Sequence, residues 1–235
     1  MLAEIDGIQY SSLEQSDRES VSDLVARDYF KRQEVIGTMD LDAPKSTMEC
    51  GRAIFDACFS DGISAKAVDP TNGRVVGVRL SYVSRKGEPN PLKGELYREM
   101  RDGHTQRIHQ KVLDSLGVLL YVDGLMPPIY QQWNVEEYVA FVLINVSKNY
   151  DDRGIAQHLL DFCYKQHEKK GIRVVKVLVS SPKTKHIFTK QGFDVVAAFP
   201  VKEYLVNGER FFKDVPENKE IYGLVKQFGY KNTPS

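Results

Sequence analysis

Hydrophobic and polar positions in the second half of the chain form patterns typical of alternating strands and helices. The apolar run Tyr138–Val146 has the length of a strand that is buried on both faces. A helix is predicted over about 153–170, where apolar residues recur at helical spacing, and Gly171 is typical of its end. Val174–Val179 predicts a second buried strand, and Pro182 is placed to start a short helix.

The first half predicts two helices followed by a hairpin. A strand is expected near Ile5–Tyr10, and a helix begins at about Ser16, which has the spacing of a capping box. A second helix is expected over about 46–59. The strands Ile63–Val68 and Arg74–Val83 flank an Asn-Gly pair, which is a strong hairpin signal.

A less regular middle segment separates these halves. Prolines and glycines over 84–94 predict a loop, and a polar helical stretch covers 92–116. We therefore expect a single domain over 1–235 with an insertion at approximately 85–132. Near the C-terminus, Asn207-Gly208 predicts a second hairpin. The order of elements predicts an α/β or α+β domain with a mixed sheet.

Composition narrows the functional class. The chain has 235 residues, and its 32 Lys and Arg balance 32 Asp and Glu. A zero net charge disfavours nucleic acid as the partner. No apolar run approaches the roughly 20 residues that span a bilayer, and the N-terminus does not have the pattern of a secretion signal. We expect a cytoplasmic protein without a membrane partner, a monomer or weak dimer.

Cysteine and histidine positions do not predict a metal site or a disulfide framework. Cys50, Cys58 and Cys163 are few, odd in number and without paired short spacing, so they predict reduced thiols. The five histidines form no metal-binding spacing and are expected to be solvated. We therefore expect no metal.

Candidate chemistry lies between the strand that ends at Val146 and the helix that follows it. Amides at the start of that helix, around Gly154, lack intrahelical partners and suit a phosphate or diphosphate. Gly154 and the small Ala156 allow close approach, and Arg153 adds charge. A plain helix start capped by an aspartate is the alternative. Neither a Walker loop nor a dinucleotide fingerprint is present.

The residues Asp151-Asp152-Arg153-Gly154-Ile155-Ala156 resemble the coenzyme A-binding motif of the Gcn5-related N-acetyltransferases, the GNAT superfamily. The match covers Gly154, Ile155 and Ala156, whereas Asp151 stands where the family has a basic or amide residue. The later segment Ser180–Phe193 and the order of elements are also similar to this family. The resemblance implies a mostly antiparallel central sheet flanked by helices and acetyl-CoA as cosubstrate. The cofactor-binding residues predicted are Asn145, Val146, Ser147, Arg153, Gly154, Ile155 and Ala156.

Within the superfamily, the chain is most similar to the invertebrate arylalkylamine N-acetyltransferases. The segment Tyr29–Glu34 resembles the one that carries that group's catalytic glutamate, so the resemblance implies Glu34 as the base. Ser180 and Thr184 fall where that group has a serine pair near the thioester. A helix cap and a surface hydroxyl are the alternatives for them. Other family members have a tyrosine acid at the position of Phe188, so no tyrosine acid is implied.

The acceptor chemistry explains these residue types. An alkylamine is protonated at neutral pH and must lose a proton before it attacks a thioester, so a base with a pKa near neutral helps. Glu34 could act as this base directly or through ordered water. A backbone N–H near Asn145 or Val146 would stabilise the oxyanion. Tyr29, Phe30 and Met126 are candidates for an aromatic amine pocket, although ordinary packing is the alternative.

The sequence thus predicts acetyl transfer from acetyl-CoA to a small primary arylalkylamine, of the dopamine, serotonin, tyramine or octopamine type, by direct attack in a ternary complex. A different amine acceptor, such as a polyamine, amino acid or peptide, is one alternative. A non-catalytic acyl-CoA-binding protein is the other.

Overall fold

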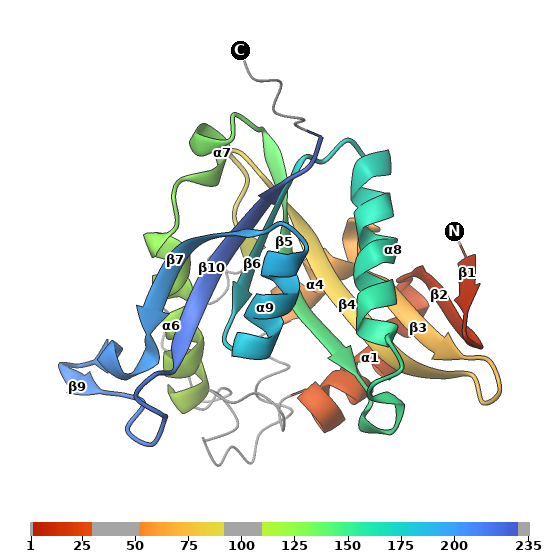
Figure 1. The fold of residues 1–235 in the computed structure, drawn as a ribbon, viewed down its shortest axis with the longest axis horizontal. Helices are drawn as coiled ribbons and strands as arrows, with labels where there is room; N and C mark the ends of the chain where they lie inside the picture. Colours follow the sequence, from red (N-terminus) through yellow and green to blue (C-terminus); the bar gives the residue numbers. More distant parts are fainter. Residues whose placement is uncertain (1, 30–51, 92–109, 230–235) are drawn as a thin grey trace.

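The computed structural model describes residues 2–29, 52–91 and 110–229 (Figure 1). Eight strands form one sheet in the order β1-β2-β3-β4-β5-β6-β10-β7, and two short strands pair separately. Every neighbouring pair in the large sheet is antiparallel except β5 and β6. The fold is therefore the mixed, mostly antiparallel sheet with flanking helices that the sequence predicted.

The N-terminal strand differs from the prediction, because it is a hairpin of two strands. β1 covers Leu2–Ile5 and β2 covers Ile8–Ser12. Asp6 and Gly7 form the turn between them, with φ of 50° and 72°. A left-handed pair of this kind matches the twist of a two-residue hairpin. The Asp6-Gly7 pair is a hairpin signal that the sequence analysis missed.

The first helical region begins with a short 3-10 turn. It comprises η1 (Gln15–Asp17), α1 (Arg18–Leu24) and the π-helical turn η2 (Val25–Tyr29). The capping box predicted at Ser16 is instead made by Glu14 and Asp17, and the Glu14 amide donates to Asp17 Oδ2 at 2.8 Å. Glu14 therefore takes the N-cap position that was predicted for Ser16, and Asp17 is the N3 residue of the box.

The central elements follow the predicted order. The segments before β5 are α4 (Arg52–Ser60), β3 (Ala65–Asp69), β4 (Arg74–Arg85), α6 (Gln110–Leu125) and α7 (Ile129–Gln132). The segments from β5 onward are β5 (Glu137–Val146), η3 (Lys148–Tyr150), α8 (Ile155–Lys169), β6 (Val174–Val179) and α9 (Pro182–Lys190). Gly171 has the left-handed conformation expected of a helix end. The predicted strand–helix–strand–helix unit is confirmed.

The C-terminal region corrects the predicted hairpin. Its elements are β7 (Asp194–Pro200), η4 (Val201–Glu203), β8 (Leu205–Val206), β9 (Glu209–Arg210) and β10 (Glu220–Gln227). The Asn207-Gly208 turn joins only the two-residue strands β8 and β9. The long partner of β7 is β10, which the sequence analysis missed and which lies between β6 and β7.

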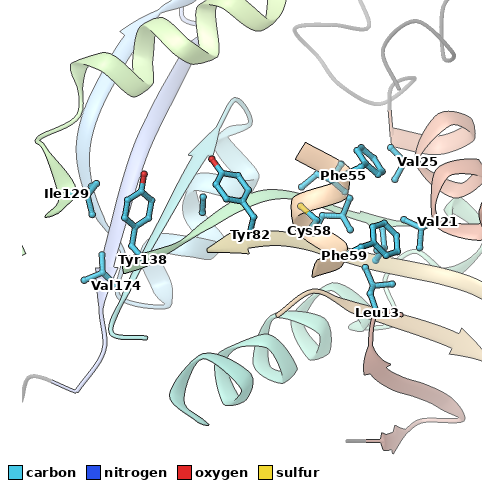
Figure 2. Packing of buried hydrophobic residues seen from close by; sticks show 14 of the residues in the cluster. Leu13, Val21, Val25, Phe55, Cys58, Phe59, Tyr82, Ile129, Tyr138 and Val174 are labelled. Carbon is cyan, nitrogen blue, oxygen red and sulfur yellow. The ribbon is translucent and has the colours of Figure 1, made fainter. Parts of the chain in front are cut away.

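Helices cover both faces of the sheet. α8 and α9 lie on the near face in Figure 1, where their apolar side chains pack with those of β5 and β6. α1, α4 and α7 pack on the opposite face, in the largest apolar cluster, part of which is drawn in Figure 2. The Tyr82 and Tyr138 rings in that cluster project from the neighbouring strands β4 and β5.

Candidate functional site

The junction between β5 and α8 has the geometry that exposes backbone donors. After β5, the Ser147 amide donates to Val76 of β4 at 2.8 Å, and η3 follows. Gly154 is the N-cap of α8, with φ of 72° and ψ of 3°. Gly154 has no side chain that could accept the first amides of the helix, and those amides have no intrahelical acceptor. The aspartate-capped alternative differs from this, because a glycine holds the cap position.

Two turns of the sheet hold this junction in place. The Tyr150 hydroxyl donates to Asp69 Oδ2 at 2.6 Å, in the turn between β3 and β4. Arg153 lies over the Tyr150 ring, 5.2 Å from its centroid, and donates to the Asp6 carbonyl at 3.5 Å. Hydrogen bonds from Thr71, and then from Tyr150, lower the pKa of Asp69 to about 2. The Arg153 side chain is thus directed to the β1–β2 turn.

Close packing brings the start of α8 against the sheet. Ile155 is 2% exposed and packs over β4. A Cβ at Gly77 would lie 3.0 Å from Ile155 Cγ2 and 3.2 Å from Leu159 Cδ1, so a larger residue there would have to displace these side chains. Ala156 is half-buried beside it. The side chain of Ile155 therefore anchors the helix, and its contribution to a ligand site is the backbone amide.

β5 and β6 separate beyond their first few residues. The two strands pair in parallel only at Val139, Ala140 and Phe141 of β5, which face Val175, Lys176 and Val177 of β6. On its other side β5 pairs with β4, and the register of that pairing shifts so that Val142 is an extra residue in β5. A bulge of this kind bends a strand and increases its twist. We call the opening between residues 142–146 of β5 and the end of β6 the fork.

The backbone of β5 turns one set of amides toward the fork. Since Ser147 donates to β4 and backbone groups alternate along a strand, the Asn145 amide also faces β4 and the Val146 amide faces the fork. The Asn145 side chain is buried and donates to the Leu24 carbonyl at 3.3 Å. Of the two predicted oxyanion donors, only Val146 therefore has the required direction.

Ser180 and Thr184 lie near the end of β6 that bounds the fork. Ser180 directly follows the last residue of β6, and Thr184 lies in the first turn of α9; both are half-buried. Ser181 is the N-cap of α9, so neither predicted hydroxyl holds that position. Phe188 is 3% exposed and packs on Phe141 and Phe193, with ring centroids 5.9 and 4.9 Å away.

The predicted amine pocket is described only in part. Tyr29 ends the π-helical turn η2 and packs, half-buried, against the cluster of Figure 2. Phe30 and Glu34 lie outside the described residues. Met126 is 7% exposed, and a Cβ at Gly223 would lie 2.7 Å from its side chain. Met126 therefore packs as a core residue, against β10.

Asp28 is a candidate that the sequence analysis did not single out. Its Oδ2 is buried and accepts no hydrogen bond within the described part of the chain; Arg27 Nε is 3.7 Å away. The π-helical turn that carries Asp28 contacts β5, whose Asn145 holds the preceding helix. A buried carboxylate oxygen of this kind can attract an ammonium group. The signal was absent from the sequence because a π-helical turn has no distinctive residue pattern.

A second buried polar cluster lies where β5 and β6 are still paired. Lys176 Nζ forms an ion pair with Asp123 Oδ1 and a 3.4 Å hydrogen bond to the Tyr138 hydroxyl. Burial lowers the pKa of Lys176, but Asp123 and Tyr138 outweigh it and raise the pKa above its ordinary value.

Within the described ranges, no group of His, Cys, Asp and Glu is arranged to hold a metal ion. None of the helices described has the length and apolarity needed to cross a bilayer.

Comparison with solved structures defines the fold. An arylalkylamine N-acetyltransferase 2 from Aedes aegypti superposes with a TM-score of 0.79 at 14% identity, over 95% of this chain and 100% of that chain. A mosquito arylalkylamine N-acetyltransferase-like 5b gives 0.75 at 18% identity, over 94% and 99%. A Drosophila melanogaster polyamine N-acetyltransferase, which forms N-acetylagmatine, gives 0.72 at 12%, over 94% and 99%. No family model matches the sequence.

These superpositions span almost the whole of both chains in each comparison. The chain therefore has the fold of the Gcn5-related N-acetyltransferases, as the resemblance implied. Within that fold, its similarity extends to insect structures of both the arylalkylamine and the polyamine type.

Proposed function

We propose that the protein is an acyl-CoA-dependent N-acetyltransferase that transfers the acetyl group of acetyl-CoA to the primary amine of a small arylalkylamine. The observation that carries this proposal is the combination of the fork with the uncapped start of α8. A helix N-terminus offers amides and a positive dipole end to the diphosphate of coenzyme A. A separated pair of strands offers unpaired backbone groups to the amide-containing arm of the same molecule.

The residues at the junction fit the diphosphate of coenzyme A. Gly154 adopts a left-handed conformation and carries no Cβ toward the open amides. The amides of Ile155 and Ala156 follow it, and the Ile155 side chain is buried away in the core. Arg153 lies beside the turn, where its side chain can exchange the Asp6 carbonyl for a phosphate. Charge-assisted hydrogen bonds favour that exchange.

The reaction requires one proton to leave the acceptor before the carbon–nitrogen bond forms. An alkylammonium has no lone pair, so a base must take a proton from it. Resemblance assigns this role to Glu34, either directly or through water. The neutral amine then attacks the thioester carbonyl, the carbon–sulfur bond breaks, and coenzyme A leaves as a thiolate that takes up a proton.

Negative charge develops on the thioester oxygen during that attack. The Val146 amide faces the fork and is the backbone donor placed to stabilise it. Ser180 lies at the same opening, and its hydroxyl is a predicted group that could protonate the departing thiolate. Position 188 supplies no hydroxyl because it is a phenylalanine, and its ring is buried among aromatic rings.

A thiol-release assay with acetyl-CoA and a panel of amines tests the proposal. We expect turnover with tyramine, dopamine, serotonin or octopamine, and little with spermidine or agmatine. Turnover only with the polyamines would transfer the assignment to that acceptor class. Binding of coenzyme A without turnover of any amine would make the protein a non-catalytic acyl-CoA binder and contradict the proposal.

The role of Glu34 is tested separately. Glu34→Gln should lower kcat/KM by about 10²–10⁴-fold near neutral pH, the range for loss of a general base, and the deficit should shrink at high pH as free amine accumulates. Glu19→Gln, on the exposed face of α1, is the matched control. An unchanged pH profile in the Glu34 variant would remove it from the role of base.

A further inference from the structure

Arg79 of β4 is a buried cation without a carboxylate partner in the described part of the chain. The residue is 1% exposed, and its Nε and Nη2 atoms make no hydrogen bond with any described group. Burial lowers the pKa of Arg79 to about 10, which still leaves the guanidinium charged at neutral pH. A charge in a protein interior is unfavourable unless the surroundings compensate it. A need for apolar packing alone does not explain an arginine here.

The contacts that Arg79 does make all converge on the bulge of β5. Its Nη1 donates to the Leu143 carbonyl at 3.0 Å and also to the Leu80 carbonyl. These two residues face each other across the β4–β5 ladder, directly beside the extra residue Val142. The guanidinium carbon lies 3.2 Å from the centroid of the Phe141 ring. Arg79 therefore holds the residues on both sides of the bulge.

Phe141 and Leu143 are also the residues at which the fork begins. Phe141 is the last residue of β5 that pairs with β6, through Val177. Leu143 is the first residue after the bulge, and the Val146 amide lies further along the same strand. A bulge interrupts the ladder locally, so a side-chain donor at its carbonyls compensates for that interruption. Fixing these carbonyls fixes the direction in which the rest of β5, still paired with β4, diverges from β6.

We propose that Arg79 is a positioning residue for acyl transfer. By hydrogen bonding to the carbonyls beside the β5 bulge and stacking on Phe141, it fixes the separation of β5 from β6 and the direction of the Val146 amide. This inference rests on the proposed function. The side chain acts through the backbone of β5 and does not touch the substrate. The planar guanidinium suits this task, because one nitrogen bonds two carbonyls while the face stacks on the ring.

Arg79→Met and Arg79→Lys test this role, with Arg85→Met as the matched control. Arg85 is at the end of the same strand, 42% exposed, and donates to Asp61 at 3.1 Å. We expect Arg79→Met to lower kcat by about 10- to 100-fold while the amine KM changes less than threefold, the pattern for a group that orders the transition state alone. Arg79→Lys keeps the charge but loses the planar face that stacks on Phe141, so it should recover only part of kcat. Arg85→Met should retain the original kcat.

Amide hydrogen exchange separates this proposal from the proposed function. In Arg79→Met, or in Arg79→Lys if the first variant does not fold, exchange should accelerate at residues 142–146 and stay unchanged at residues 138–140. If the original protein lacks acetyltransferase activity, the proposed function fails, but the exchange pattern still reports whether Arg79 holds the bulge. Unchanged exchange at the bulge, or an original kcat in folded Arg79→Met, would overturn the inference.

Discussion

The buried ion pair between Asp123 of α6 and Lys176 of β6 allows a quantitative prediction. The two side chains are only 5% and 8% exposed. Asp123→Asn removes the anion but leaves the Lys176 ammonium enclosed, with the Tyr138 hydroxyl 3.4 Å away. Breaking one partner of a buried pair typically costs about 3–5 kcal/mol, because the remaining charge is uncompensated. We expect Asp123→Asn to lose stability in that range.

The double variant Asp123→Leu with Lys176→Met isolates the cause of the loss. Replacing both partners by apolar groups removes the stranded charge, so this variant should lie within about 1 kcal/mol of the original. For a chain of this length, a loss of 3–5 kcal/mol lowers Tm by about 6–20 °C. Thermal and urea unfolding, followed by circular dichroism, measure both quantities.

An exposed pair provides the control for this cycle. Lys86 and Glu136 approach to 2.8 Å, but their side chains are 52% and 78% exposed. Glu136→Gln should therefore change the free energy of unfolding by less than about 1 kcal/mol. If Asp123→Asn costs no more than this control, or if the double variant is as unstable as the single one, the argument from a stranded buried charge is wrong.

Three further predictions concern titration and reactivity. His167 is 0% exposed, so the prediction that the histidines are solvated is wrong for this residue. Burial, with a contribution from Arg79, lowers the pKa of His167 to about 3. Between about pH 6.5 and 3 the unfolded chain therefore binds more protons than the folded protein, and stability should fall on acidification by up to about 1.4 kcal/mol per pH unit. In His167→Phe, the urea midpoint should vary less with pH across that window. Burial raises the pKa of Cys163 to about 12 and that of Cys58 further, so neither thiol should react in the native protein. Peptide mass spectrometry should find both cysteines unlabelled by N-ethylmaleimide in the native protein and labelled in urea. Labelling of either one in the native protein would contradict this. Tyr150→Phe should raise the pKa of Asp69 without restoring its ordinary value, because the Thr71 hydrogen bonds remain; an unchanged pKa in an NMR titration would refute that reading.

The parts of the fold with local signals were predictable from the sequence. β5 and β6 are mostly apolar runs, and the glycine at 171 and the proline at 182 mark where helices end and begin. Each of these signals depends on a few neighbouring residues. The Gly154 turn was predicted in the same way, because a glycine before a helix is visible without knowing the rest of the fold.

The features that depend on distant contacts were not predictable. β10 was missed because its apolar stretch is short and contains Gly223, and its partners β6 and β7 come earlier in the chain. The bulge at Val142 is a mismatch of register between two strands, which neither strand shows alone. Arginine is mostly an exposed residue in proteins, so the burial of Arg79 becomes visible only once the β4–β5 pairing is known.

Calorimetric titration of coenzyme A tests the central claim, that the Gly154 turn holds the diphosphate. Gly154→Ala and Gly171→Ala impose the same left-handed strain at opposite ends of α8, since the two glycines have φ of 72° and 71°. A Cβ at either position meets only ordinary contacts or open space, so the two variants should be similarly destabilised. We predict that Gly154→Ala weakens coenzyme A binding about tenfold or more and that Gly171→Ala leaves it unchanged. Equal affinities in the two variants, or no binding to the original protein, would contradict the claim.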